Sequence, residues 1–224
     1  MTTNTCFSAY FDVKDNPKRL GHMKGVRGLD LDFFISSKNH KLLTAKHIQL
    51  NKDNLPALKY MNNLRNYCFG KKYVFTKFGK QIKGRAFFEL SSIWCSKILL
   101  FKEIKKLAST DFITWLDCRD HHHKKKILKY RYKKLNAEAY RRTRLPEKPY
   151  RGLLTHEVIN HRPWMHASVL KMPIGMVDEI IGKYTESLLF ADRNFEIYDE
   201  EAVLAHMASR DPELFYIHEL GLRP

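Results

Sequence analysis

Residues 112–120 read Phe-Ile-Thr-Trp-Leu-Asp-Cys-Arg-Asp, an apolar run that ends in acidic residues. The first five are typical of a short strand buried on both faces, as in the parallel sheets of α/β proteins. Residues 89–107 precede this strand and place apolar side chains at helical spacing, as expected of an amphipathic helix. The sequence therefore predicts an α/β fold in which this strand ends at a crevice, because ligands gather at the carboxyl ends of parallel strands.

Two carboxylates, Asp117 and Asp120, follow the predicted strand directly. Carboxylate oxygens favour a hard divalent cation, and such a cation would in turn bind a diphosphate. Alternatively, Asp117 caps the next helix and Asp120 lies in its first turn, where negative charge suits the helix dipole. These residues alone leave both interpretations open.

Strand-like and helix-like segments alternate along the rest of the chain. We expect strands at 5–11, 31–36, 46–50, 72–76, 164–172 and 214–218, and helices at 56–65, 177–189 and 200–209. Together they predict a single domain over residues 1–224 with a Rossmann-like mixed sheet flanked by helices. A basic helical segment at 121–151 is expected as an insertion in that domain.

The composition is that of a folded globular chain. Its 224 residues are 44% hydrophobic and 12% aromatic, enough to bury a full core. No charged-then-apolar leader is apparent, and apolar runs such as 98–101 fall far short of the ~20 residues that span a bilayer. The four scattered cysteines have neither disulfide nor zinc spacing. We therefore expect a cytoplasmic protein, in the host cytoplasm if the chain is viral, with reduced thiols.

Positive charge is concentrated in residues 121–151. The whole chain carries +16, and this segment holds twelve Lys or Arg against two acids, a net charge of +10. Such density attracts polyanions, and interleaved tyrosines would also allow stacking on bases. A solvated basic helix is the alternative. The candidate nucleic-acid contacts are Lys124, Lys125, Lys126, Lys129, Arg131, Arg141, Arg142 and Arg144.

Lys97 lies at the edge of the apolar face of the helix predicted at 89–107. Burying its ammonium without a partner would cost several kcal/mol or lower its pKa. Either the side chain extends its charge to water, or the ammonium meets a carboxylate or a phosphate.

Five stretches resemble nucleotide-sugar glycosyltransferases of the A-type fold, especially small HtrL-like bacterial proteins. They are Phe-Ser-Ala-Tyr-Phe-Asp at 7–12, Trp-Cys-Ser-Lys at 94–97, Phe-Ile-Thr-Trp-Leu-Asp at 112–117, Tyr-Asp-Glu-Glu-Ala-Val-Leu at 198–204 and Ile-His-Glu-Leu-Gly-Leu-Arg-Pro at 217–224. The last is similar to the terminal His-x-x-Gly-x-x-Lys-Pro of the glycogenin-like retaining group, with Arg223 in the lysine position. The resemblance spans most of the chain and implies a retaining enzyme more than an inverting one.

The resemblance also implies roles for single residues. Asp117, Asp120 and His218 would bind Mn²⁺ or Mg²⁺. Contacts to the donor would come from Asp12 near the nucleobase, Lys97 near the phosphates or the acidic motif, and Arg223 at the diphosphate. The family motif has one residue between its acids, whereas Cys118 and Arg119 intervene here. Either Asp120 reaches the metal from another turn, or Asp117 binds alone and Arg119 replaces part of the ion's charge.

Sugar transfer from a nucleotide builds negative charge on the leaving phosphate, which cations stabilise. Asp199, Glu200 and Glu201 are the candidates to orient the acceptor or donor sugar, or to accept a proton; the alternative is a capping Asp199 with first-turn acids. The expected activity is transfer from a nucleotide sugar to a hydroxyl acceptor, with a hydroxymethylated base in phage DNA as the favoured acceptor. The alternatives are transfer to lipopolysaccharide or another glycan, and a non-catalytic nucleic-acid-binding module.

Overall fold

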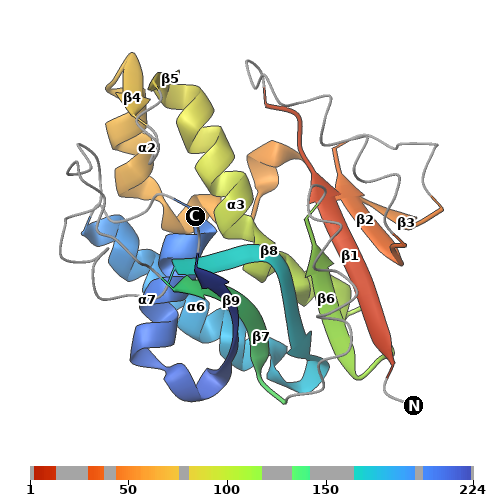
Figure 1. Cartoon of the computed structure of the whole chain (residues 1–224). Coiled ribbons are helices and arrows are strands. Elements are labelled where there is room, and N and C mark those ends of the chain that lie inside the picture. The colour runs from red at the N-terminus through yellow and green to blue at the C-terminus, as the bar shows by residue number, and fades with distance from the viewer. Residues whose placement is uncertain are drawn as a thin grey trace.

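A seven-stranded mixed sheet forms the centre of the structure, a computed structural model that describes residues 3–13, 30–37, 44–75, 81–117, 133–141, 164–194 and 199–222 (Figure 1). Its strands are β1 (Asn4–Tyr10), β2 (Phe33–Ser36), β3 (Lys46–Gln49), β6 (Phe112–Leu116), β7 (Leu135–Arg141), β8 (Trp164–Pro173) and β9 (Phe215–Leu222). They are arranged in the order β3-β2-β1-β6-β8-β7-β9. The predicted α/β class, with a mixed sheet flanked by helices, is confirmed.

The directions of the strands bring most of their carboxyl ends to one edge of the sheet. β8 pairs antiparallel with β6 and β7, whereas every other pair in this sheet is parallel. The carboxyl ends of β1, β2, β3, β6, β7 and β9 therefore lie at the same edge. Asp12 and Asp117 follow β1 and β6 there, at the edge where α/β sheets bind ligands.

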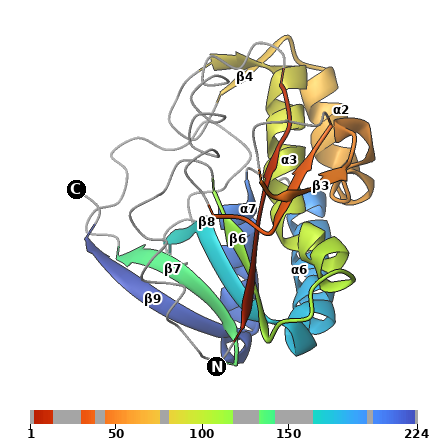
Figure 2. The same cartoon turned by 90° about the vertical axis from the view of Figure 1, so that its right-hand side faces the viewer.

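The described helices are α2 (Asn62–Phe69), α3 (Gly84–Lys105), α6 (Val177–Arg193) and α7 (Glu200–Arg210). Short 3-10 turns lie at η1 (Lys52–Asn54), η2 (Leu58–Tyr60), η3 (Ile174–Met176) and η4 (Pro212–Leu214), and β4 (Tyr73–Phe75) pairs with β5 (Gln81–Lys83) as a separate hairpin. α3 packs against β6 and α7 against β8, and Figure 2 shows α3 and α6 on one side of the sheet. Within the part of the chain described here, no helix has both the length and the hydropathy to cross a membrane.

Aromatic packing joins α3 to the middle of the sheet. The ring of Phe7 on β1 meets Phe101 of α3 at 4.8 Å and Trp115 of β6 at 5.3 Å, both in edge-to-face geometry. Each fully buried side chain of this size contributes about 1.5–3 kcal/mol. All five residues of β6 are buried, as the apolar run at 112–116 predicts. This packing fixes which part of α3 lies over the end of β6.

The predicted helical character of residues 121–151 is wrong for residues 135–141, which form strand β7. Leu135, Asn136 and Ala137 are buried, and β7 is hydrogen-bonded to β8 on one side and to β9 on the other. Two partner strands therefore override the local helix preference of Leu, Ala and Glu. The other residues of the basic segment lie outside the described residues, apart from Lys133 and Lys134, which are exposed.

The helix expected at 56–65 is shifted towards the C-terminus: residues 58–60 form the turn η2, and α2 begins only at Asn62. Its first amide groups are bonded by a distant carboxylate, because Asp192 of α6 accepts from the backbone N–H of Asn63 and of Leu64, each at 3.0 Å. The cap that decides where this helix starts thus comes from almost 130 residues away. Periodicity in the local sequence does not contain that information.

Gly84, the first residue of α3, packs directly against the backbone at the end of α2. A Cβ at this position would lie 2.0 Å from the carbonyl oxygen of Cys68 and 2.5 Å from that of Lys71. The backbone N–H of Gly84 also donates to the carbonyl of Lys72 at 3.3 Å. Only glycine allows two backbones to approach so closely. The hairpin between α2 and α3 is therefore held at its base.

Gly182, in the middle of α6, has no such reason to be glycine. It is exposed, and a Cβ there would meet nothing within 4 Å. Glycine in a helix interior is less stable than alanine by about 0.5–1 kcal/mol. We expect Gly182→Ala to raise the free energy of unfolding by that amount in urea denaturation. An unchanged or lower value would show that α6 does not tolerate alanine in the way that its open surroundings indicate.

Candidate active site

Lys97 of α3 is buried between two carboxylates that come from different parts of the chain. Its Nζ donates to Oδ2 of Asp117 at 3.1 Å and to Oε1 of Glu200 at 2.5 Å. Asp117 follows β6 and Glu200 is the first residue of α7. Of the two outcomes left open for Lys97, the structure therefore shows the ion pair with carboxylates. We call Lys97, Asp117 and Glu200 the ion triad.

Burial and charge act in opposite directions within the ion triad. Burial alone would lower the pKa of Lys97, but Glu200 and Asp117 more than offset it and hold that pKa above its usual range. Burial raises the pKa of the Glu200 carboxyl; Lys97 opposes this rise, and Asp199 and Glu201 add to it. Asp117 is the member that reaches solvent, with 28% of its side chain exposed against 7% for Lys97. A ligand entering from the sheet edge would meet the triad through Asp117.

Asp199 and Glu201, on either side of Glu200, have other contacts. Asp199 has an extended backbone and caps α7, because its Oδ1 accepts the backbone N–H of Ala202 at 3.1 Å. Oε1 of Glu201 accepts the backbone N–H of Ala167 at 3.4 Å. The capping alternative for Asp199 is therefore what the structure shows. Cap and strand contact together fix the first turn of α7, and so fix Glu200 against Lys97.

The contact to Ala167 depends on an irregularity in β8. Between its pairings with Asn136 and Glu138, β8 moves from Lys171 to His166, so five steps on β8 face two on β7. Such bulges interrupt the ladder and re-aim the backbone, often near functional sites. Here the interruption leaves the backbone N–H of Ala167 available to donate to the Glu201 side chain of α7. The start of α7 is thereby tied to the sheet beside β6.

The floor of the site is apolar. Nζ of Lys97 lies 5.5 Å from the centre of the Trp115 ring, a cation–π contact. Cys95 is fully buried, and burial raises the pKa of its thiol well above the usual range. Burial likewise raises the pKa of the Tyr184 hydroxyl well above its usual range, and Glu200 adds to this rise. Cys95 and Tyr184 are therefore neutral supports beneath the ion triad rather than nucleophiles.

The other predicted site residues are dispersed. Asp12 lies at the carboxyl edge after β1. His218 lies on β9, which β8 and β7 separate from β6, and its Nε2 is 3.4 Å from Oδ1 of Asn136. The structure thus places His218 beside Asn136 and not beside Asp117. Arg141 is in β7. The predicted residues outside the described part of the chain are Arg119, Asp120, Arg223, Lys124, Lys125, Lys126, Lys129, Arg131, Arg142 and Arg144.

The described donors do not by themselves fit a divalent cation. In the described ranges, no three His, Cys, Asp or Glu side chains converge as metal ligands would. Asp117, the one predicted ligand in the ion triad, accepts a hydrogen bond from Lys97. Hard cations usually take six or more oxygen ligands, several of them from protein carboxylates. Asp117 with its described neighbours does not meet that requirement.

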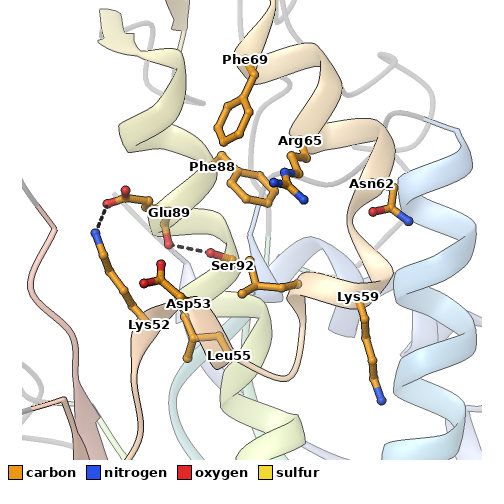
Figure 3. A pocket seen from close by; sticks show the side chains of 11 residues that line it. Lys52, Asp53, Leu55, Lys59, Asn62, Arg65, Phe69, Phe88, Glu89 and Ser92 are labelled. Atoms are coloured by element: carbon orange, nitrogen blue, oxygen red, sulfur yellow. Dashed lines mark hydrogen bonds and ion pairs between the residues drawn. The ribbon is translucent and has the colours of Figure 1, made fainter.

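A pocket of about 420 Å³ opens between η1, η2, α2 and α3 (Figure 3). Lys52 and Glu89 form an ion pair at 3.1 Å on one side, and Arg65 points towards the pocket from the other. The lining residues are Lys52, Asp53, Leu55, Leu58, Lys59, Asn62, Arg65, Phe69, Phe88, Glu89 and Ser92. None of them was among the candidates taken from the sequence. The available signal was the run 62–88, which contains seven Lys or Arg and no Asp or Glu.

Comparison with known proteins gives similarity in fold only. No family model and no curated protein matches the chain. Mouse xyloside xylosyltransferase 1, in its apo form, is 10% identical over 96% of this chain and 85% of that chain, with a TM-score of 0.49. A glycosyltransferase involved in the glycosylation of the major capsid of PBCV-1 is 12% identical over 96% and 81%, with a TM-score of 0.41. Likeness at this level does not assign an activity.

Proposed function

We propose that this chain is a glycosyltransferase that transfers a sugar from a nucleoside-diphosphate sugar to a hydroxyl group. The observation that carries the proposal is the ion triad at the carboxyl edge of the sheet. Lys97 is buried between Asp117, predicted as a metal ligand, and Glu200, predicted to orient the acceptor or donor sugar or to accept a proton. Lys97 and Glu200 are 103 residues apart in the sequence. Charged groups desolvated at the ligand-binding edge of a sheet are typical of functional sites. The sequence resemblance supplies the reaction class.

The chemistry assigns the triad a defined task. Transfer breaks the bond between the anomeric carbon and the leaving phosphate, forms a bond from that carbon to the acceptor oxygen, and passes the hydroxyl proton to the departing nucleoside diphosphate. Positive charge develops at the sugar, and a fixed carboxylate stabilises it without reorganising. Lys97 positions Asp117 and Glu200 for this task, with Asp117 towards solvent. Asp199 is occupied as a helix cap, so we assign it a structural role rather than that of a base.

For the acceptor we propose a hydroxymethylated base in phage DNA. The net charge of +16 and the +10 carried by residues 121–151 support a polyanionic acceptor. A base in a duplex would have to leave the stack before its hydroxyl could attack the sugar. The terminal His-Glu-Leu-Gly-Leu-Arg-Pro at 218–224 supports retention of configuration through its similarity to the glycogenin-like group.

A donor-binding assay tests the proposal. We expect one nucleoside diphosphate, with manganese present, to stabilise the wild-type protein in thermal denaturation, since a ligand at ~100 times its dissociation constant adds ~2.7 kcal/mol. Asp117→Asn should remove that shift. The matched control is Asp178→Asn, which removes an exposed carboxylate at the start of α6. Stabilisation of Asp117→Asn equal to that of the wild type would contradict the assigned site, and no shift with any nucleotide would contradict donor binding.

A further inference from the structure

Cations and aromatic rings gather on the surface formed by α2, the β4–β5 hairpin and the first turn of α3. We define the α2–α3 patch as Arg65, Phe69, Lys71, Lys72, Tyr73 and Arg85, all of which are exposed. In Figures 1 and 2 these elements lie at the end of the molecule towards which β1 runs from the N-terminus. The patch therefore lies at the same end as the carboxyl edge of the sheet.

The positive charge of the α2–α3 patch is not compensated by any carboxylate in the described part of the chain. Among the residues that the structure describes, no carboxylate forms an ion pair with Arg65, Lys71, Lys72 or Arg85. Elsewhere on the surface such pairs are present, as between Lys105 and Asp178 at 2.6 Å. Uncompensated cations of one sign attract an anionic partner. The sequence extends this imbalance, because residues 62–88 contain no acid.

The aromatic rings of the patch lie next to its cations. Phe69 is 46% exposed, and the guanidinium carbons of Arg65 and Arg85 lie 5.5 Å and 5.2 Å from the centre of its ring. Tyr73 is 44% exposed and has Nζ of Lys72 at 5.6 Å. Alternating aromatic faces and cations are how proteins bind unpaired bases together with their phosphates. Neither the exposed aromatic rings nor the cations alone would indicate single-stranded nucleic acid as the partner.

Backbone geometry holds the patch together. The close approach of Gly84 to the carbonyl oxygen of Cys68 places Phe69, the next residue on α2, beside Arg85, the next residue on α3. The ring of Phe69 is also held edge-to-face by the buried Phe88, with their centres 5.5 Å apart. A ligand would therefore have to order few of these side chains when it binds, and such preorganisation favours binding.

We infer that the α2–α3 patch binds single-stranded nucleic acid, with phosphates on Arg65 and Arg85 and bases against Phe69 and Tyr73. The adjacent pocket shares Arg65 and Phe69 with the patch, and its size is within the range of small-ligand sites. The Asp53 carboxylate inside it would repel a phosphate and accept a hydrogen bond from an N–H group of a base, such as N3–H of thymine. One base of the bound strand therefore enters the pocket while its phosphates stay outside. Glu89, on the pocket wall, is about 12 Å from Lys97 along α3.

Fluorescence anisotropy with a labelled oligothymidylate tests this binding over a series of salt concentrations. Arg65→Gln/Arg85→Gln should lower affinity at least about tenfold and reduce the slope of log affinity against log salt by about 1.4. Phe69→Leu should lower affinity about fivefold or more, because a stacking face is lost. Both changes are on exposed side chains, and unchanged melting temperatures would show that the fold is kept. Because oligonucleotide binding does not require sugar transfer, this assay tests the patch independently of the proposed function.

Matched controls separate the patch from general charge. Lys105→Gln/Lys106→Gln removes the same two charges at the other end of α3, and Phe190→Leu removes a ring that is 41% exposed on α6. Both should bind the oligonucleotide nearly as the wild type does. Equal losses in the arginine pair and its lysine control would overturn the proposal, since net charge alone would then explain binding. Full affinity in Phe69→Leu, or equal binding of a duplex or of phosphatidylserine-containing vesicles, would also overturn it.

Discussion

Replacing Lys97 by Met is expected to lower the free energy of unfolding by about 3–5 kcal/mol. The Glu200 side chain is only 5% exposed, so its charge would remain in the interior without a partner. Asp199 and Glu201 already act on Glu200 with like charge. Loss of a single ammonium would therefore leave an acidic cluster at the start of α7, and urea denaturation would measure the cost.

Two further variants show whether the uncompensated charge is the cause. Adding Glu200→Leu to Lys97→Met should restore most of the lost stability, because a buried pair can be replaced by apolar groups at little cost. Lys105→Met breaks an ion pair whose side chains are 33% and 64% exposed, and should lower the free energy of unfolding far less than Lys97→Met does. If the double variant were no more stable than Lys97→Met, lost packing around Lys97 would be the cause, and the electrostatic explanation would be wrong.

Gly84→Ala should lower the free energy of unfolding by about 3 kcal/mol, the upper range for overpacking a well-packed site. The added Cβ would clash with a carbonyl oxygen of the main chain, which cannot rotate away as a flexible side chain can. Either α2 or the start of α3 must shift. Because Phe69 and Arg85 flank this contact, the same change should weaken oligonucleotide binding.

Gly182→Ala is the control for the same substitution, since it adds an identical methyl group where nothing lies within 4 Å. Thermal and urea denaturation of the two variants should therefore show changes of opposite sign. A Gly84→Ala protein as stable as the wild type would mean that the backbones separate without cost, and that the hairpin is not held at its base.

Local sequence was sufficient to predict an element where the apolar residues of that segment determine which of its side chains are buried. The apolar run 112–116 and the amphipathic stretch 89–107 both form the predicted elements, although α3 begins earlier, at Gly84. Residues 135–141 could not be predicted in this way, because Leu, Ala and Glu favour a helix locally. Only the hydrogen bonds to β8 and β9 make them a strand. The predictions therefore fail where distant segments decide the local structure.

The candidate site shows the same division. An acid after an apolar strand, and acids before a helix, indicated Asp117 and Glu200 individually. That both bind Lys97 depends on how α3 and α7 pack, which no spacing in the chain encodes. The pocket beside α2 was missed because its lining comes from four separate elements. The acid-free, basic run 62–88, which supplies part of that lining, was nevertheless visible in the sequence.

The strand order has a consequence for synthesis of the chain on the ribosome. β1 pairs with β2 soon after it is made, but its other neighbour is β6, so that edge of β1 lacks its partner strand until residue 116 has emerged. β7 in turn needs β9, which ends at Leu222. Pairings this distant in sequence are slow to form and leave strand edges open to association meanwhile. Nascent chains stalled before β6 should therefore aggregate or bind chaperones more than chains stalled after it.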